Sequence, residues 1–193
     1  MHRWPRGARV LDLFCGSGAG LVALERLGFT DVIGVDHSAL LLATYTGRFP
    51  CVHADCRDLT PIESGSADLV VIQGGLHHLD RLDEDLSQVL SESWRVLREA
   101  GALALLEPWG SPFLSFAHAV AARPWARRLS RAVDAFGTMV DEEGETYRTW
   151  LAEPGLILRT IDTWFETTWS SVAWGKRTSL GLRRPRPLAR SPR

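Results

Sequence analysis

The feature that most constrains the fold is a glycine-rich turn that follows a short apolar segment near the start of the chain. Residues 8–14 are mostly apolar, and the turn after them places glycines at Gly16, Gly18 and Gly20. Residues 19–27 carry apolar side chains at helical spacing, and Gly28 is suited to end that helix. A buried strand, a glycine turn and a helix in this order are typical of the first unit of an open α/β sheet.

The same alternation continues along the chain and predicts the fold class. Apolar runs predict strands at residues 31–35, 51–54, 67–73 and 102–107, and helical spacing predicts helices at 38–46, with Ser38 as N-cap, and at 82–97. Strands separated by helices pair in parallel. We therefore expect a Rossmann-like, doubly wound α/β sheet that is mostly parallel.

The pattern changes after Pro108. Residues 112–136 and 142–152 predict helices of an insertion that spans about residues 110–153. Residues 156–165 and 167–174 are rich in β-branched and aromatic side chains, which predicts a closing hairpin and an antiparallel C-terminal strand. Residues 176–193 hold seven basic residues, three prolines and no acidic residue, so we expect a disordered tail. One domain over residues 1–175 is expected.

Composition narrows the class of partner. The formal net charge is −1, with 23% charged and 45% hydrophobic residues, so there is no overall attraction to nucleic acid or to an anionic membrane. No apolar run approaches the roughly 20 residues that a membrane span needs. The first residues do not resemble a signal peptide, and we expect a cytoplasmic protein.

Three cysteines give a weak metal signal. Cys51, His53 and Cys56 are close in sequence, but a second pair of ligands at zinc-finger spacing is missing. Cys15 completes the set, and three cysteines cannot all form disulfides with one another. We expect no metal site.

The glycine turn and the next strand together suggest a nucleoside ligand. Glycines let the backbone approach a ligand closely, and the helix that follows offers N–H groups to an anion. Asp36 ends the second strand, where its carboxylate can accept both hydroxyls of a ribose. A dinucleotide site needs the spacing G-x-G-x-x-G, whereas these glycines run G-x-G-x-G. A nicotinamide oxidoreductase is therefore a distant alternative.

Four segments resemble class I S-adenosylmethionine-dependent methyltransferases. Residues 10–20 are similar to their first motif, 32–38 to their second and 53–56 to the segment that contacts adenine. Residues 67–79 resemble the fourth-strand motif of the branch known as methyltransferase type 11. The similarity covers about residues 8–108. Two features differ from the family: Phe14 stands where glycine is common, and few residues precede the first motif.

The resemblance implies a set of cofactor contacts. The turn would hold the methionine carboxylate, Asp36 the ribose and Asp55 the adenine amino group, and residues after the fourth strand would face the methionine part. The cofactor-binding residues expected in this way are Asp12, Cys15, Gly16, Ser17, Gly18, Gly20, Asp36, His37, Asp55, Cys56, Gln73 and Gly74.

The catalytic expectation falls on the same rim of the sheet. His77 and His78 follow the fourth strand, where a side chain with a near-neutral pKa suits a general base. The alternative is that alignment of donor and acceptor alone suffices for methyl transfer. Glu107 ends the fifth strand and either orients a ligand or forms a buried ion pair. Candidate walls of an acceptor pocket are Trp109, Phe113, Phe116, His118, Trp125 and Trp150.

The resemblance implies an enzyme that methylates a small or medium-sized metabolite, which we expect to accept the methyl group at oxygen, with nitrogen and carbon as alternatives. A nucleic-acid methyltransferase is disfavoured because the fourth strand is followed by Gln-Gly-Gly-Leu and no Pro-Cys pair follows that strand to supply the nucleophile for cytosine C5 chemistry. A non-catalytic subunit that binds S-adenosylmethionine stays open. The acceptor side is expected to be covered by the insertion, by a partner chain such as a second copy, or to be open.

Overall fold

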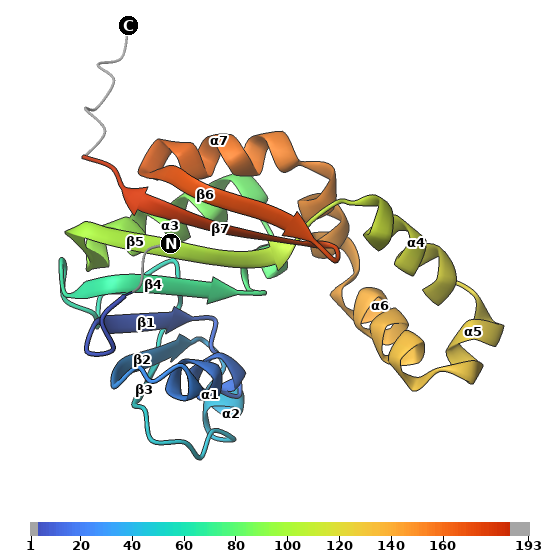
Figure 1. Cartoon of the computed structure of the whole chain (residues 1–193), viewed down its shortest axis with the longest axis horizontal. Helices are drawn as coiled ribbons and strands as arrows, with labels where there is room; N and C mark the ends of the chain where they lie inside the picture. Colours follow the sequence, from blue (N-terminus) through green and yellow to red (C-terminus); the bar gives the residue numbers. More distant parts are fainter. Residues whose placement is uncertain (1–3, 186–193) are drawn as a thin grey trace, which may run out of the picture.

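The computed structural model describes residues 4–185 and contains one seven-stranded sheet in the order β3-β2-β1-β4-β5-β7-β6 (Figure 1). The strands β1 to β5 run parallel to one another, and β7 lies antiparallel between β5 and β6. Their bounds are β1 (Arg9–Leu13), β2 (Asp31–Asp36), β3 (Cys51–His53), β4 (Ala67–Gln73), β5 (Leu97–Pro108), β6 (Phe165–Ala173) and β7 (Lys176–Arg183). The predicted Rossmann-like sheet with an antiparallel C-terminal part is confirmed.

Helices pack on both faces of the sheet. Along β1, Val10 belongs to one buried apolar cluster with Leu21 of α1, whereas Leu11 belongs to another with Leu86 of α3. Alternate residues of a strand point to opposite faces, so the sheet is covered on both sides. The helices of this part are α1 (Ala19–Arg26), α2 (Ala39–Leu42), η1 (Leu76–His78, a single 3-10 turn), α3 (Leu82–Val96) and α7 (Pro154–Trp164).

Three further helices form the predicted insertion after β5. They are α4 (Pro112–Ala121), α5 (Pro124–Leu129) and α6 (Arg131–Ala152). Figure 1 shows them projecting beyond the edge of the sheet at which the parallel strands end. The helix α6 bends at Gly144, whose φ of 52° and ψ of −118° are not helical. The helical piece predicted over residues 112–136 is divided among α4, α5 and the first part of α6, and the piece predicted over residues 142–152 is the end of α6.

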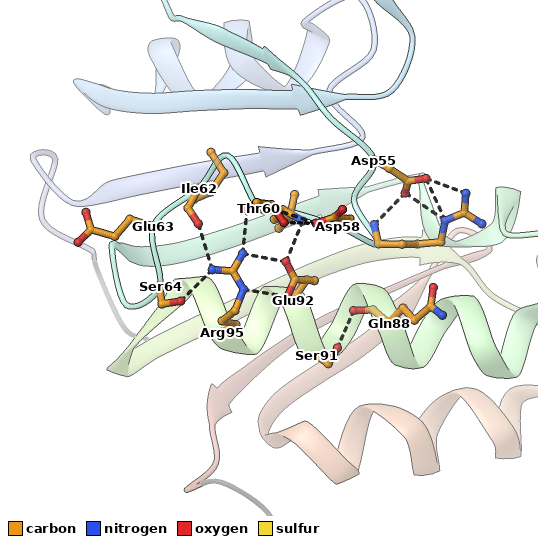
Figure 2. Close-up of polar contacts among 12 residues, drawn as sticks. Asp55, Asp58, Thr60, Ile62, Glu63, Ser64, Gln88, Ser91, Glu92 and Arg95 are labelled. Carbon is orange, nitrogen blue, oxygen red and sulfur yellow. Dashed lines mark hydrogen bonds and ion pairs between the residues drawn. The ribbon is translucent and has the colours of Figure 1, made fainter.

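An arginine on α3 holds the long connection between β3 and β4. Arg95 donates hydrogen bonds to the carbonyls of Leu59 and Ile62 and to Ser64 Oγ at 2.8–3.0 Å, and it pairs with Glu92 at 2.8 Å (Figure 2). Glu92 in turn accepts a bond from the Leu59 N–H at 2.7 Å. These contacts fix the segment without regular structure that follows β3 and contains Asp55.

Two predictions for the C-terminal part are wrong. Residues 154–164 form helix α7 instead of the first strand of a hairpin, because Ile157 and Ile161 lie one turn apart and are both buried in the cluster that also contains α3 residues. Residues 176–183 form β7 instead of belonging to a disordered tail, and they occupy an interior position in the sheet. Residues 186–193 lie outside the described residues.

Smaller differences concern element lengths. The second helix covers Ala39–Leu42 and not residues 38–46, although Ser38 does cap it by accepting a bond from the Leu41 N–H at 3.3 Å. Within residues 4–185, no helix combines the length and the apolar character needed to cross a membrane.

Candidate functional site

A cavity of about 430 Å³ lies at the carboxyl ends of β1 and β2. The residues that line it come from the glycine turn, the end of β2, the segment after β3 and the segment around η1. Six of the predicted cofactor-binding residues are among them: Gly16, Asp36, His37, Asp55, Cys56 and Gly74. Phe14, Leu41 and Leu79 add apolar surface to the same cavity.

Asp36 connects the glycine turn to the end of β2. Its Oδ2 accepts a hydrogen bond from the Gly16 N–H and its Oδ1 from the Ser38 N–H, both at 2.8 Å. The residue is buried, with 5% of its surface exposed, and it lines the cavity. Each carboxylate oxygen has a second lone pair, so the group can still accept hydroxyl donors from a ligand. His37 Nδ1 lies 3.7 Å from Asp36 Oδ1 and is exposed.

Asp55 lies at the opposite wall and is held by its neighbour. Arg57 pairs with both carboxylate oxygens, and the shortest distance, from Nη2 to Oδ2, is 2.7 Å. The hydrogen bonds from Arg57 keep the pKa of Asp55 below its usual value. The carboxylate is therefore ionised and fixed in direction at neutral pH, and Arg57 also reaches Asp85 at 3.3 Å.

The other residues predicted from the turn do not line the cavity. These are Asp12, Cys15, Ser17, Gly18 and Gly20. Gly18 supports the turn, because it has a φ of 89° and a Cβ there would lie 2.1 Å from the Tyr45 ring. Cys15 is buried beside Gly34 and Cys51. Asp12, Cys15 and Gly18 are buried and support the turn, whereas Ser17 is exposed. A direct cofactor contact from any of these residues stays a prediction.

Asp12 is buried directly beneath the turn. It is 2% exposed, its Oδ2 finds no hydrogen-bond partner among the described residues, and a Cβ on Gly20 would lie 2.3 Å from that oxygen. Burial raises the pKa of the carboxyl group to about 7. Gly20 is thus required because the carboxyl group of Asp12 fills the space that a side chain would need.

The structure shows how the turn accommodates Phe14 at a position where the family commonly has glycine. Its φ is 59°, a left-handed conformation that glycine adopts without cost and that a bulky residue rarely adopts. The ring packs on Gly75, where a Cβ would lie 2.3 Å from Phe14 Cγ. The turn therefore accommodates the ring because a glycine stands across from it.

A second cavity, of about 610 Å³, lies between the end of β4, the insertion and the turn between β6 and β7. Its walls are mostly apolar and aromatic. They comprise Gln73, Gly74, His77, Leu106, Pro108, Phe113, Leu114, Phe116, Ala117, Val120, Ala132, Val133, Phe136, Met139, Tyr147, Trp174 and Lys176. The helices α4 and α6 thus provide much of the wall of this cavity.

Gly74 lines both cavities. It follows the last residue of β4, its N–H donates to the Leu106 carbonyl at 2.9 Å, and its φ is 68°. A Cβ at this position would meet nothing closer than His77 Cε1 at 3.8 Å, so the glycine is favoured by its backbone conformation and not by crowding. A group bound in one cavity at Gly74 therefore adjoins a group bound in the other.

His77 and Glu107 form a buried pair at this junction. His77 Nδ1 lies 2.8 Å from Glu107 Oε2, and Glu107 Oε1 accepts the N–H groups of Gly75 and Leu76 at 2.9 Å. The exposed fractions of the two residues are 5% and 3%. Glu107 thus orients the histidine and fixes the turn that carries it. The two histidines differ, since His77 is buried against the second cavity and His78 is exposed on the first.

The predicted acceptor walls divide into two groups. Phe113 and Phe116 line the second cavity, whereas Trp125 is exposed on α5 and Trp150 is buried with its Nε1 donating to the Pro108 carbonyl. His118 bonds to Tyr147 Oη at 3.1 Å, and Trp109 lies under the Arg177 guanidinium. The sequence reading missed several wall residues, namely Phe136, Met139, Tyr147, Trp174 and Lys176. Aromatic residues at helical spacing in the insertion were the available signal.

The three cysteines lie in different surroundings. Cys51 is beside Cys15, whereas Cys56 belongs to the other apolar cluster, and His53 Nε2 bonds to the His37 carbonyl at 2.8 Å. Burial raises the pKa of the Cys56 thiol to about 12. Across residues 4–185, no group of three His, Cys, Asp or Glu side chains is arranged to hold a metal ion.

Comparisons with known proteins identify a matching family, similar sequences and a similar fold. The methyltransferase domain family matches residues 11–105. A ubiquinone/menaquinone biosynthesis C-methyltransferase of Geobacter sulfurreducens is 35% identical over 118 residues, which are 54% of this chain and 43% of that protein. A carboxy-S-adenosyl-L-methionine synthase of Actinobacillus pleuropneumoniae is 31% identical over 110 residues, which are 52% of this chain and 45% of that protein. The chain thus spans less than half the length of these curated relatives.

A solved structure shares the fold over nearly all of the chain. Geranyl diphosphate C-methyltransferase from Streptomyces coelicolor, in complex with Mg²⁺, geranyl diphosphate and S-adenosyl-L-homocysteine, aligns with a TM-score of 0.64. The alignment covers 94% of this chain and 74% of that one at 14% sequence identity. At this level of identity the likeness concerns the fold.

Proposed function

We propose that the chain is an S-adenosylmethionine-dependent methyltransferase that methylates a small, largely apolar acceptor at a hydroxyl oxygen. Residues 11–105 match the methyltransferase domain family. The observation that carries the proposal is the position of Gly74, which lines a cavity with nucleoside-binding groups and a cavity with apolar walls. Methyl transfer needs a donor and an acceptor in line and in contact. Two cavities that share one wall residue, with a buried histidine beside it, meet that need.

The first cavity fits the cofactor. Asp36 keeps lone pairs directed at ribose hydroxyls while its backbone bonds hold it in place, and Asp55 supplies a fixed carboxylate for the adenine amino group. Leu41 and Leu79 offer apolar surface to the purine, and Gly16 gives the methionine part a close approach to the backbone. When bound, S-adenosylmethionine supplies a methyl group already activated on a sulfonium.

His77 is the group that we assign as general base. Its Nδ1–H donates to Glu107 Oε2, and this bond orients the ring and fixes the tautomer in which Nε2 is the basic nitrogen. The imidazole lines the acceptor cavity, so it can take the proton of an acceptor hydroxyl as the oxygen attacks the methyl carbon. Glu107 then stabilises the imidazolium. The second predicted base, His78, lines the cofactor cavity instead.

The substitution His77→Gln tests this assignment with 2-naphthol as the acceptor probe. We expect kcat to fall about 100-fold or more, since a general base contributes at least that much, while affinity for S-adenosylhomocysteine is unchanged. Glu107→Gln should lower kcat and change the pH profile, and Glu99→Gln, on the same strand but exposed, serves as the matched control.

Mass spectrometry and NMR identify the product as 2-methoxynaphthalene or as the carbon-methylated 1-methyl-2-naphthol. The first supports transfer to oxygen, and the second contradicts it while leaving methyl transfer intact. Binding of S-adenosylmethionine without transfer to any phenol, naphthol or aliphatic alcohol would instead favour a non-catalytic subunit. A dominant loss of rate in His78→Gln, with His77→Gln unaffected, would overturn the choice of base.

A further inference from the structure

The turn between β6 and β7 holds a tryptophan in an unfavourable conformation. Ala173 pairs with Lys176, so Trp174 and Gly175 form a two-residue hairpin turn, and both have positive φ, 52° and 74°. Turns of this kind favour Asn-Gly, because an L residue with a bulky side chain is strained in the left-handed region. A tryptophan at the first position therefore needs a compensating role.

Burial within the protein does not supply that compensation. Trp174 is 79% exposed, and among the large hydrophobic residues of the described chain only Leu129, at 80%, is more exposed. Its ring meets Phe113 edge-on, with centroids 5.2 Å apart at 90°, and both rings line the acceptor cavity. The turn is tied to this place, since the Gly175 carbonyl accepts the Trp109 N–H at 2.8 Å and a Cβ on Gly175 would lie 3.0 Å from Leu114. The indole is thus held at the cavity wall with a large surface uncovered.

The rest of the cavity limits what can cover that surface. Among its described lining residues there is no arginine and no carboxylate, and Lys176 is the single ammonium group. A di- or tricarboxylate acceptor would leave charges unpaired in an apolar site, which is costly. Phe136 and Tyr147 line the same cavity, so aromatic rings also stand beyond the Phe113–Trp174 pair. Aromatic ligands gain from stacked and edge-on contacts with such rings beyond the area they bury.

We propose that the acceptor is a fused aromatic molecule with one ring hydroxyl, and that Trp174 determines this specificity by stacking on its ring system. The proposal rests on the proposed function, because it names the substrate class of the same site. A cavity of about 610 Å³ falls in the range that holds drug-sized ligands.

The test compares two probes that differ in aromaticity and share a fused two-ring skeleton with one hydroxyl. The affinities of 2-naphthol and of its saturated analogue decahydro-2-naphthol are measured by calorimetry on the full chain with S-adenosylhomocysteine. We expect a preference of about tenfold for 2-naphthol. Trp174→Asn should reduce the preference to about threefold or less, and Trp174→Phe should restore most of it. Trp125→Gln, an exposed tryptophan away from the cavity, is the control.

Thermal unfolding separates this role from a structural one. Asn-Gly suits the turn better than Trp-Gly, so Trp174→Asn should raise Tm while it weakens naphthol binding. A lower Tm together with equal losses for both probes would show that Trp174 only supports the hairpin, and equal affinity of the wild type for both probes would overturn the proposal.

The outcome is distinguishable from that of the proposed function, because binding is measured without turnover. Selective binding of 2-naphthol without methylation supports the acceptor class and contradicts the activity. Methylation of both probes at equal efficiency supports the activity and contradicts the role of Trp174.

Discussion

The two cavities that meet at Gly74 are built on different principles. The cofactor cavity gathers carboxylates and backbone N–H groups at the ends of parallel strands, where Asp36 is fixed by two hydrogen bonds of 2.8 Å. The acceptor cavity is walled by apolar and aromatic side chains of α4, α6 and the β6–β7 turn. Recognition in the first depends on single polar atoms, and recognition in the second depends on the shape and area of an apolar surface.

The largest expected effect comes from Asp36→Ala, which removes the carboxylate that we propose accepts the ribose hydroxyls together with its bonds to Gly16 and Ser38. Hydrogen bonds to a charged group contribute about 1.5–3 kcal/mol each, so affinity for S-adenosylhomocysteine should fall about 100-fold or more in calorimetry. Asp31→Ala, at the other end of β2, is the matched control. If Asp36→Ala and Asp31→Ala bound S-adenosylhomocysteine equally well, binding in the cofactor cavity would not depend on the Asp36 carboxylate.

The second largest effect is the loss of folding stability caused by burying the carboxyl group of Asp12 beneath the turn. Its pKa is about 7 in the folded chain and 3.8 without burial, so the unfolded state releases the proton first as pH rises. Stability should therefore fall between about pH 4 and pH 7 and stay level above that range. A difference of about three pKa units corresponds to at most about 4 kcal/mol.

Urea unfolding of Asp12→Asn across this pH range checks the expectation. The variant should lose this part of the pH dependence and be more stable than the wild type at pH 8, whereas the exposed Asp134→Asn should follow the wild type. If the free energy of unfolding changed with pH in the same way in the wild type and in Asp12→Asn, burial would not disfavour the ionised form of the Asp12 carboxyl group.

The smallest effect on ligand affinity is expected in the acceptor cavity. Phe136→Ala removes one aromatic wall of the acceptor cavity, and we expect affinity for 2-naphthol to fall about tenfold, because a buried ring contributes in proportion to its area. Affinity for S-adenosylhomocysteine should stay the same. Leu129→Ala, exposed on α5 and outside the cavity, provides the comparison. A loss of cofactor affinity in Phe136→Ala would mean that the two cavities are not independent.

The residues of the cofactor cavity could be predicted from the sequence because they have fixed places relative to short motifs. Asp36 lies at a strand end, Gly74 directly after another, and parallel strands bring these ends to one edge of the sheet. The role of the turn residues stays a prediction. Asp12, Cys15 and Gly18 are buried beneath the turn and do not line the cavity, because a local turn motif does not specify which of its positions face a ligand.

The C-terminal part was less accessible. Ile157 and Ile161 favour a strand by residue type, and their burial with the α3 residues makes the segment helical. Residues 176–183 read as a charged tail, although Ser179 is buried and the segment pairs with β5 on one side and β6 on the other. Both errors have one cause, which is that long-range packing outweighs local composition.

The sequence by itself determined the parallel α/β core, the glycine turn and the carboxylate of Asp36, because strand and helix periodicity and glycine chemistry are local properties. The tertiary structure decided that Glu107 orients His77, that Gly74 joins two cavities and that Trp174 stands at the acceptor wall. Each of these depends on residues 30 to 100 positions apart meeting at one edge of the sheet, and local pattern carries no information about such contacts.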